Sequence, residues 1–192
     1  QALYGVLQGG VYDDLRREAA SFVLSRPFFG HAIGGCLGAS TAQMLEVVGY
    51  TMRYLDSIQP VHLLGIGGVG DIWAGVKMGI DSFDCVAPTR IARHGWALSQ
   101  TGGVKFRLNL KNARFRDDSN PLESLCNCHA CKYFSRAYIH HLFKANEMLG
   151  IQLVTLHNIA FMTRLMVIIR KAIAEDRLAD AERDWFDSTT EG

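Results

Sequence analysis

Residues 61–86, VHLLGIGGVGDIWAGVKMGIDSFDCV, contain one complete strand–helix–strand unit. The apolar run Val61–Ile66 is typical of a buried strand and ends among glycines. Asp71 then starts a short helical stretch, Ile72 to Met78, which Gly79 stops. The β-branched and apolar run Ser82–Val86 follows as a second strand. This order predicts a βαβ unit with parallel strands.

Two further units precede this one. The runs Leu3–Leu7 and His31–Ile33 are predicted strands, and apolar residues at helical spacing follow each of them. These residues are Leu15, Ala19 and Phe22 after the first run, and Leu45, Val48, Met52 and Leu55 after the second. About four units fit before residue 90, which is half of a (β/α)₈ barrel or the core of a smaller open sheet. The pattern by itself leaves both architectures open.

The pattern changes after residue 90. The segments Trp96–Gln100 and Val104–Leu110 flank Thr101-Gly102-Gly103 and are predicted to form a hairpin. A polar stretch and a cysteine cluster follow. We then expect one helix carrying Tyr138, Leu142, Ala145 and Leu149, closed by Gly150, and a last helix carrying Met162, Leu165, Ile169 and Ile173.

Composition places the chain among folded globular proteins. Of its 192 residues, 48% are hydrophobic and 20% are charged, and the formal net charge is +1. Disorder is therefore excluded, and any nucleic-acid surface must come from local clustering of basic residues. We find no apolar run of bilayer length and no signal segment, which favours the cytoplasm and no membrane partner. Because the chain opens with Gln1 and at once a strand, we expect it to be cut from a longer protein.

Three of the five cysteines lie together, as Cys126-x-Cys128-x₂-Cys131. An odd count with this spacing favours a reduced metal site over a disulfide framework, although three buried thiols would give the same pattern. His157 follows after 25 residues and completes a Cys₃His set suited to structural, tetrahedral Zn²⁺. Spacing favours His157 and leaves open the other nearby histidines, which are His129, His140 and His141.

Polar residues gather where the predicted strands end. The segment from Asp81 to Arg90 places a carboxylate at the C-terminal end of the predicted strand, and in βα folds chemistry collects at that edge of the sheet. Asp81 and Asp84 are the two candidates, and their spacing of three should place them on opposite sides of an extended strand. Both could instead be turn or cap residues. Arg90 and Arg93 follow and could hold phosphates, or could belong to a solvated loop. The glycines at 65–70 match GxGxxG only formally, and they more simply allow close approach of a backbone or a planar base.

Taken together, these segments resemble the queuine/archaeosine tRNA-ribosyltransferase family, in its bacterial and eukaryotic branch. The similarity is collinear and covers nearly the whole chain. Its motifs are YGVLQGG at 4–10, AIGG at 32–35, LLGIG at 63–67, GIDSFDCVAPTR at 79–90, KNARF at 111–115, CNCHAC at 126–131, SRAYIHHL at 135–142 and LHNIAF at 156–161. The resemblance implies the C-terminal half of a (β/α)₈ TIM barrel with an inserted zinc-binding subdomain. The implied parts are later barrel units at 1–110, the zinc subdomain at 111–160 and a C-terminal helix at 161–192.

The resemblance also implies an activity and its residues. It implies exchange of the wobble guanine of tRNA for a 7-deazaguanine, either queuine or preQ1, in a homodimer. Asp84 matches the nucleophile, which forms a covalent ribosyl–aspartate, while the acid/base aspartate lies upstream of this chain. Gln8 and Gly35 match base-binding residues. Two tRNA-contacting loops are implied, namely Gly65, Ile66, Gly67, Gly68, Val69, Gly70 and Asp71, and then Thr89, Arg90, Ile91, Ala92 and Arg93. The zinc ligands match Cys126, Cys128, Cys131 and His157.

Three positions depart from the family pattern. Cys36 replaces a leucine, Ser40 stands where glutamate is common, and the loop at 65–68 lacks a lysine. Gly38 stands where relatives that take preQ1 carry valine, so we expect a wider pocket and queuine as a substrate. Two other functions are considered, a non-catalytic partner subunit and a zinc-stabilised RNA-binding module. The intact segment around Asp84 favours the enzyme.

Overall fold

The computed structural model describes residues 1–35, 37–55 and 58–187, so Cys36 lies outside the described residues. The chain divides into two compact units, Gln1–Val86 and Ala87–Gly192. Each unit has its own cluster of buried apolar side chains. The segments 111–160 and 161–192 both belong to the second unit, and their functional division stays a proposal.

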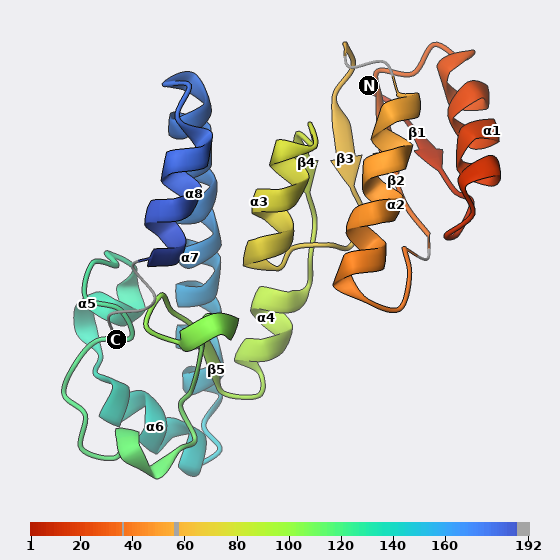
Figure 1. Cartoon of the computed structure of the whole chain (residues 1–192). Helices are drawn as coiled ribbons and strands as arrows, with labels where there is room; N and C mark the ends of the chain where they lie inside the picture. Colours follow the sequence, from red (N-terminus) through yellow and green to blue (C-terminus); the bar gives the residue numbers. More distant parts are fainter. Residues whose placement is uncertain (36, 56–57, 188–192) are drawn as a thin grey trace. The chain divides into compact units, whose positions relative to one another are not determined.

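The first unit is a parallel α/β layer (Figure 1). Four strands lie in the order β1-β2-β3-β4. They are β1 (Tyr4–Leu7), β2 (Gly30–Ile33), β3 (Val61–Leu63) and β4 (Ser82–Phe83). The helices between them are α1 (Asp13–Leu24), α2 (Thr41–Tyr54) and α3 (Val69–Lys77). The predicted parallel βα units are therefore confirmed as far as residue 83.

Register explains how this layer forms a core. Leu7 pairs with Ile33, and Ile33 pairs with Leu63, so the three side chains lie side by side on one face. All three are almost fully buried and pack with apolar residues of α1 and α2. Strand β3 is shorter than predicted because the chain turns at Gly65, whose φ is +74°. The turn places the backbone N–H of Gly65 beside Asp84, which directly follows β4.

A buried arginine holds the loop after β1. The side chain of Arg16 is fully buried, and its Nε donates to the carbonyl of Gly10 at 2.9 Å. Its Nη1 donates to the carbonyl of Leu7 at 3.3 Å. The hydroxyl of Tyr50 donates to the carbonyl of Val11 at 2.8 Å, which ties the same loop to α2. The residues that follow β1 are thus fixed by side chains from two helices.

The second unit combines a hairpin with helices (Figure 1). Strands β5 (Trp96–Leu98) and β6 (Arg107–Asn109) pair antiparallel, which confirms the predicted hairpin. The connection is longer than expected because it contains the 3₁₀ helix η1 (Gly103–Lys105). The other elements are α4 (Ala87–Ala92), η2 (Ala113–Phe115), α5 (His129–Tyr133), α6 (Arg136–Lys144), α7 (Met148–Ala174) and α8 (Leu178–Asp187).

Two predicted helix ends are wrong. The helix expected to close at Gly150 ends at Lys144, because Asn146 adopts a left-handed φ of 57°. Gly150 instead lies in the first turn of α7, where a Cβ would lie 3.1 Å from the Cβ of Leu142, so it lets α7 approach α6. The predicted last helix is two helices, since Asp176 with a φ of 51° separates α7 from α8.

Helix α7 corrects the expectation that no apolar segment reaches bilayer length. It has 27 residues and contains an 18-residue stretch with a mean hydropathy of 1.4, so it is long and apolar enough to cross a membrane by length and composition alone. The helix packs against α4, α5, α6 and β5, and buries the polar residues His157 and Asn158. These contacts are those of a core helix, so its composition is weak evidence for a membrane segment.

Candidate active site and metal centre

Asp84 is the carboxylate at the carboxyl end of β4. Its Oδ1 accepts a hydrogen bond from the backbone N–H of Gly65 at 2.9 Å and lies 3.1 Å from Nε2 of His62. Both donors approach the same oxygen. The other oxygen, Oδ2, receives no hydrogen bond from the part of the chain that the structure describes. The side chain is 59% exposed, so a ligand can reach Oδ2.

The environment of Asp84 favours its charged form. The hydrogen bond from the Gly65 N–H, followed by that from His62, lowers the pKa of Asp84 from its ordinary value against a smaller effect of burial. The carboxylate is therefore ionised at neutral pH. An exposed, ionised and oriented carboxylate can act as a nucleophile or as a base. Asp81, by contrast, accepts a hydrogen bond from the backbone N–H of Val61 at 2.7 Å, which is a role in the sheet.

Gln8 and Gly35 meet at the ends of β1 and β2. A Cβ built on Gly35 would lie 2.4 Å from Oε1 of Gln8, and Gly35 has a φ of +82°. Glycine is therefore required here both by the close approach and by the backbone conformation. Gly35 also lines a cavity of ≈ 470 Å³. Its other lining residues are Leu37, Gly38, Ala39, Ser40, Thr41, Met44, Leu64, Gly65, Ile66 and Asp71.

Gly65 links this cavity to Asp84, because it lines the cavity and also donates to the carboxylate. Gly67 is buried, and a Cβ there would lie 2.4 Å from the Cβ of Cys85. Only a glycine at position 67 therefore allows the loop to pack against Cys85. Gly68 precedes α3 and Gly70 is exposed within it, whereas the Val69 side chain is in the core. Burial raises the pKa of Asp71, and a hydrogen bond from the Gly68 backbone opposes this rise.

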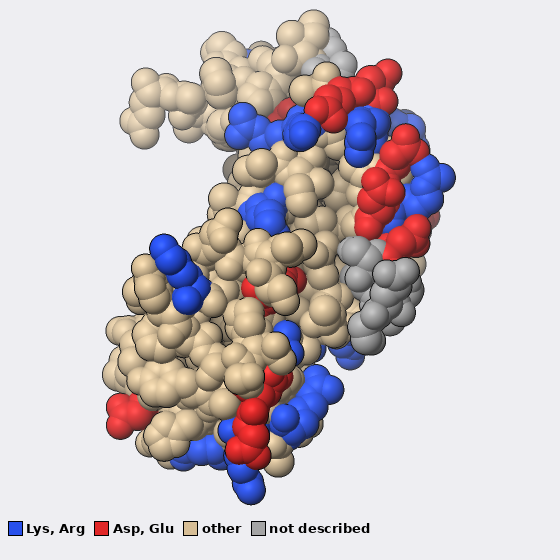
Figure 2. All heavy atoms as spheres, turned by 90° about the vertical axis from the view of Figure 1, so that its left-hand side faces the viewer, with Lys and Arg blue, Asp and Glu red and all other residues tan. Residues whose placement is uncertain are grey.

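The segment 89–93 belongs to the second unit and lies largely in α4. Arg90 and Arg93 are exposed, Thr89 and Ile91 are half-buried, and Ala92 is fully buried. The two arginines are thus available to an anion, whereas the Ala92 side chain serves the core. Figure 2 shows, on the face it presents, basic side chains interspersed with acidic ones and separated by uncharged areas. That face therefore carries small groups of basic side chains and no broad basic surface, in accord with the net charge of +1.

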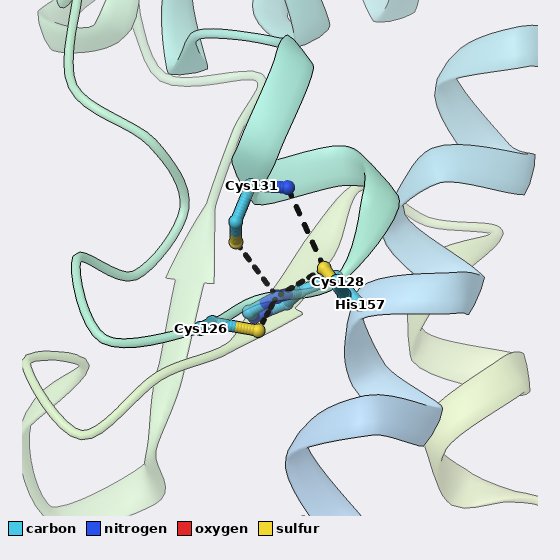
Figure 3. Close-up of side chains that lie close together, drawn as sticks. All are labelled: Cys126, Cys128, Cys131 and His157. Atoms are coloured by element: carbon cyan, nitrogen blue, oxygen red, sulfur yellow. Dashed lines mark hydrogen bonds between the residues drawn. The ribbon is translucent and has the colours of Figure 1, made fainter.

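The predicted metal ligands converge in the second unit (Figure 3). Nδ1 of His157 lies 3.3 Å from Sγ of Cys131 and 3.7 Å from Sγ of Cys126 and of Cys128. A tetrahedral Zn²⁺ with ordinary bond lengths separates its nitrogen and sulfur ligands by about 3.6 Å. All four ligand atoms lie within 4.8 Å of one another. The donor set and its size therefore fit zinc held by protein ligands alone.

Hydrogen bonding selects His157 over its neighbours. Nε2 of His157 donates to the carbonyl of Leu98 at 2.7 Å, which leaves Nδ1 for the metal. His140 is buried but bonds the carbonyl of Leu110 at 2.7 Å, and the ring of His129 packs 4.9 Å from that of Tyr133. His141 is exposed. The choice of His157 is confirmed as part of the cluster that can hold a metal.

The four ligands perturb one another's protonation. Burial lowers the pKa of His157, but hydrogen bonds with Cys126 and Cys128 outweigh it and raise the pKa to about 9. Hydrogen bonds with Cys131 and then with His157 lower the pKa of Cys128 to about 3 against the effect of burial. Cys128 would therefore bind zinc as a thiolate, and zinc binding would release the proton that these hydrogen bonds favour on Nδ1 of His157.

Comparison with known proteins accounts for this combination of sites. A family described as queuine tRNA-ribosyltransferase matches residues 1–191. The chain belongs to the queuine tRNA-ribosyltransferase family. It is 50% identical over 186 residues to the queuine tRNA-ribosyltransferase of Roseiflexus sp. (strain RS-1), which covers 97% of this chain and 46% of that protein.

Other members of the family are almost as similar. Proteins of the same name from Thermoanaerobacter sp. (strain X514) and Staphylococcus haemolyticus (strain JCSC1435) are each 44% identical over 97% of this chain. The matched part is 49% of the former and 48% of the latter. The chain therefore spans about half the length of the curated relatives it matches.

Sequence reasoning missed two residues of these sites. His62 lies beside Ser82 in the register of β3 and β4, and a correct strand alignment would have placed it near Asp84. Asn158 follows His157 and is fully buried, with hydrogen bonds to three backbone groups. The sequence signal for Asn158 is an amide side chain next to His157 in an otherwise apolar stretch of the helix.

Proposed function

We propose that the full-length protein is a tRNA-guanine transglycosylase, which exchanges the wobble guanine of tRNA for a 7-deazaguanine. The observation that carries this proposal is the ionised, exposed carboxylate of Asp84, held at one oxygen by a loop that also lines a cavity. A covalent ribosyl–aspartate on Asp84, followed by its displacement, would give two inversions and net retention. Membership of the family supports this reaction for the whole protein.

The other site residues take complementary roles. Gln8 and the backbone of Gly35 would hold the base, and Gly65–Asp71 with Thr89–Arg93 would contact the tRNA. The cluster of three cysteines and His157 would hold one structural Zn²⁺ between helix α7 on one side and α5 with the loop before it on the other. In the full-length protein we propose a closed (β/α)₈ barrel, a homodimer and a cytoplasmic location. A non-catalytic partner subunit is the alternative.

The first test replaces the nucleophile. Asp84→Asn should abolish exchange of labelled guanine in full-length protein and leave tRNA binding and the melting temperature nearly unchanged, since the amide is similar in shape but a poor nucleophile. Unmodified protein should form a denaturation-resistant adduct with anticodon stem–loop RNA, and the variant should not. Asp14→Asn, an exposed carboxylate on α1, is the matched control. Exchange at near wild-type rate in Asp84→Asn would rule out the assignment.

Queuine is the base that we propose, and this choice is based on Gly38. Gly38 lines the cavity and has a φ of +112°, and a Cβ there would lie 2.6 Å from Oε1 of Gln43. Valine at this position would therefore strain the loop as well as fill space. The sharper test is competition in the unmodified enzyme, with kcat/KM measured for queuine and for preQ1. We expect queuine to be accepted at least as well, and a strong preference for preQ1 would contradict the proposal.

A further inference from the structure

Three side chains form a continuous hydrogen-bonded chain, namely His62 of β3, Ser82 of β4, and Asp84, which directly follows β4. His62 pairs with Ser82 in the parallel register, and its Nδ1 lies 2.8 Å from Oγ of Ser82. Its Nε2 lies 3.1 Å from Oδ1 of Asp84. The His62 side chain is 23% exposed, so its ring is held between the two partners with limited access to water. The imidazole thus connects the proposed nucleophile to the neighbouring strand.

The chemistry of the partners sets the direction of these bonds. An ionised carboxylate can only accept hydrogen bonds. Nε2 of His62 must therefore carry a hydrogen and donate a hydrogen bond to Asp84. In neutral imidazole the other nitrogen then has a free lone pair, and it accepts from the hydroxyl of Ser82. Asp84 therefore selects the tautomer of His62 that has its proton on Nε2, and the Ser82 hydroxyl stabilises this tautomer by donating to Nδ1.

We propose that His62 is a positioning residue that makes Oδ2 of Asp84 the attacking atom and that speeds release of the covalent intermediate. This inference rests on the proposed role of Asp84. His62 and the Gly65 N–H both bind Oδ1, so the carboxylate cannot rotate freely and presents Oδ2 to the ligand. After attack through Oδ2, Oδ1 becomes the ester carbonyl oxygen and keeps both donors.

The two displacements place opposite demands on these hydrogen bonds. In the first, a lone pair of Oδ2 forms a bond to C1′, the C1′–N9 bond breaks, and the pair on guanine takes up a proton from water. Negative charge leaves the carboxylate, so the donors orient it but also stabilise its unreacted form.

In the second displacement, the incoming base loses its N9 proton to water and N9 bonds to C1′. The C1′–Oδ2 bond then breaks and its electron pair returns to Asp84. Charge now develops on the carboxylate, and the donors stabilise it.

Loss of the His62 donor should therefore slow the second displacement more than the first. We expect His62→Ala in full-length protein to lower the steady-state exchange rate about tenfold or more, as removal of a preorganised donor does. The fraction of enzyme trapped as RNA adduct should rise at the same time. His62→Gln retains an N–H donor at a similar position and should restore both quantities in large part. Ser82→Ala should show a weaker form of the His62→Ala effect.

These measurements separate this inference from the proposed function. If the unmodified protein forms no adduct and Asp84→Asn keeps its activity, the proposed function fails. If the unmodified protein forms the adduct and His62→Ala leaves exchange and adduct level unchanged, only the inference about His62 fails. A fall in exchange and adduct together, not rescued by Gln, would also overturn it, since that result indicates a merely structural role. Circular dichroism and melting temperature verify that each variant is folded.

Discussion

At the scale of single residues, Asp84 shows how backbone and side chain share the control of one carboxylate. The donor with the largest effect on the pKa of Asp84 is the Gly65 N–H. This N–H lies beside the carboxylate because Gly65 turns the chain with a left-handed backbone conformation. The second donor is His62. Because both favour the charged form, the pKa of Asp84 lies below its ordinary value, and the carboxylate loses its nucleophilic form only as the pH falls through this lowered pKa.

We expect this shift to be directly measurable. In full-length protein, carboxyl-carbon NMR should place the titration midpoint of Asp84 below the ordinary value of 3.8. His62→Ala should move the midpoint upwards, and His62→Gln should move it less, since glutamine can still donate. The Gly65 N–H should keep part of the shift in all three proteins. A midpoint that does not respond to His62→Ala would contradict the hydrogen bond between these side chains.

At the scale of elements, α7 organises the second unit through two adjacent buried polar residues. His157 faces the cysteines, whereas Asn158 binds the backbone of other segments. The Asn158 amide accepts from the N–H of Leu98 at 2.7 Å and donates to the carbonyls of Pro88 and Trp96 at 2.9 and 3.1 Å. One side chain therefore joins α7 to β5 and to α4.

Asn158→Ala should destabilise the protein by about 2–4 kcal/mol, because it leaves buried backbone donors and acceptors without partners. Denaturant unfolding of the full-length protein, followed by circular dichroism, measures this loss. Thr163→Ala, an exposed position on the same helix, should change stability by less than about 0.5 kcal/mol. An Asn158→Ala variant as stable as this control would contradict the structural role of the amide.

At the scale of the whole molecule, the proposed zinc site lies within one of the two compact units. The ligands all belong to the second unit, and the cores of the two units share no buried residue. Because structural metal binding contributes folding free energy, Cys128→Ser should lower zinc content and melting temperature together. The melting temperature should fall by roughly 5 °C or more, since a loss of about 2 kcal/mol has this effect in a domain of this size.

Hydrogen exchange adds a regional measurement to the same variant. Protection should fall at 96–157 and change little at 1–55 if the metal stabilises its own unit. Cys85→Ser, a cysteine outside the cluster, should keep the metal and the melting temperature. A Cys128→Ser protein that loses zinc but melts at the same temperature would show that the metal is not structural.

The local sequence was sufficient for the parallel units, the hairpin and the metal cluster. Alternating strand and helix patterns predict parallel strands because only a crossover helix returns the chain to the same edge. Cysteine spacing predicts a metal site because three thiolates within six residues reach one ion without help from the rest of the fold. The position of Asp84 at a strand end follows from the same local pattern.

The partners of His157 and of Asp84 were decided by the tertiary structure alone. Spacing left four histidines as candidates for the fourth metal ligand. The structure favours His157, because α7 places it beside the Leu98 carbonyl and the three thiols. His62 meets Asp84 only through the register of two strands that are twenty residues apart, and register depends on how both strands bury their faces. The helix ends at Lys144 and Ala174 differ from prediction because Asn146 and Asp176 adopt left-handed conformations. Both helix ends are local caps, since the N–H of Glu147 donates to the carbonyl of Leu142 and the N–H of Arg177 donates to the carbonyl of Ala172. The nearby sequence therefore carries these helix ends, whereas the partners of His157 and Asp84 depend on packing between segments that are far apart in the chain.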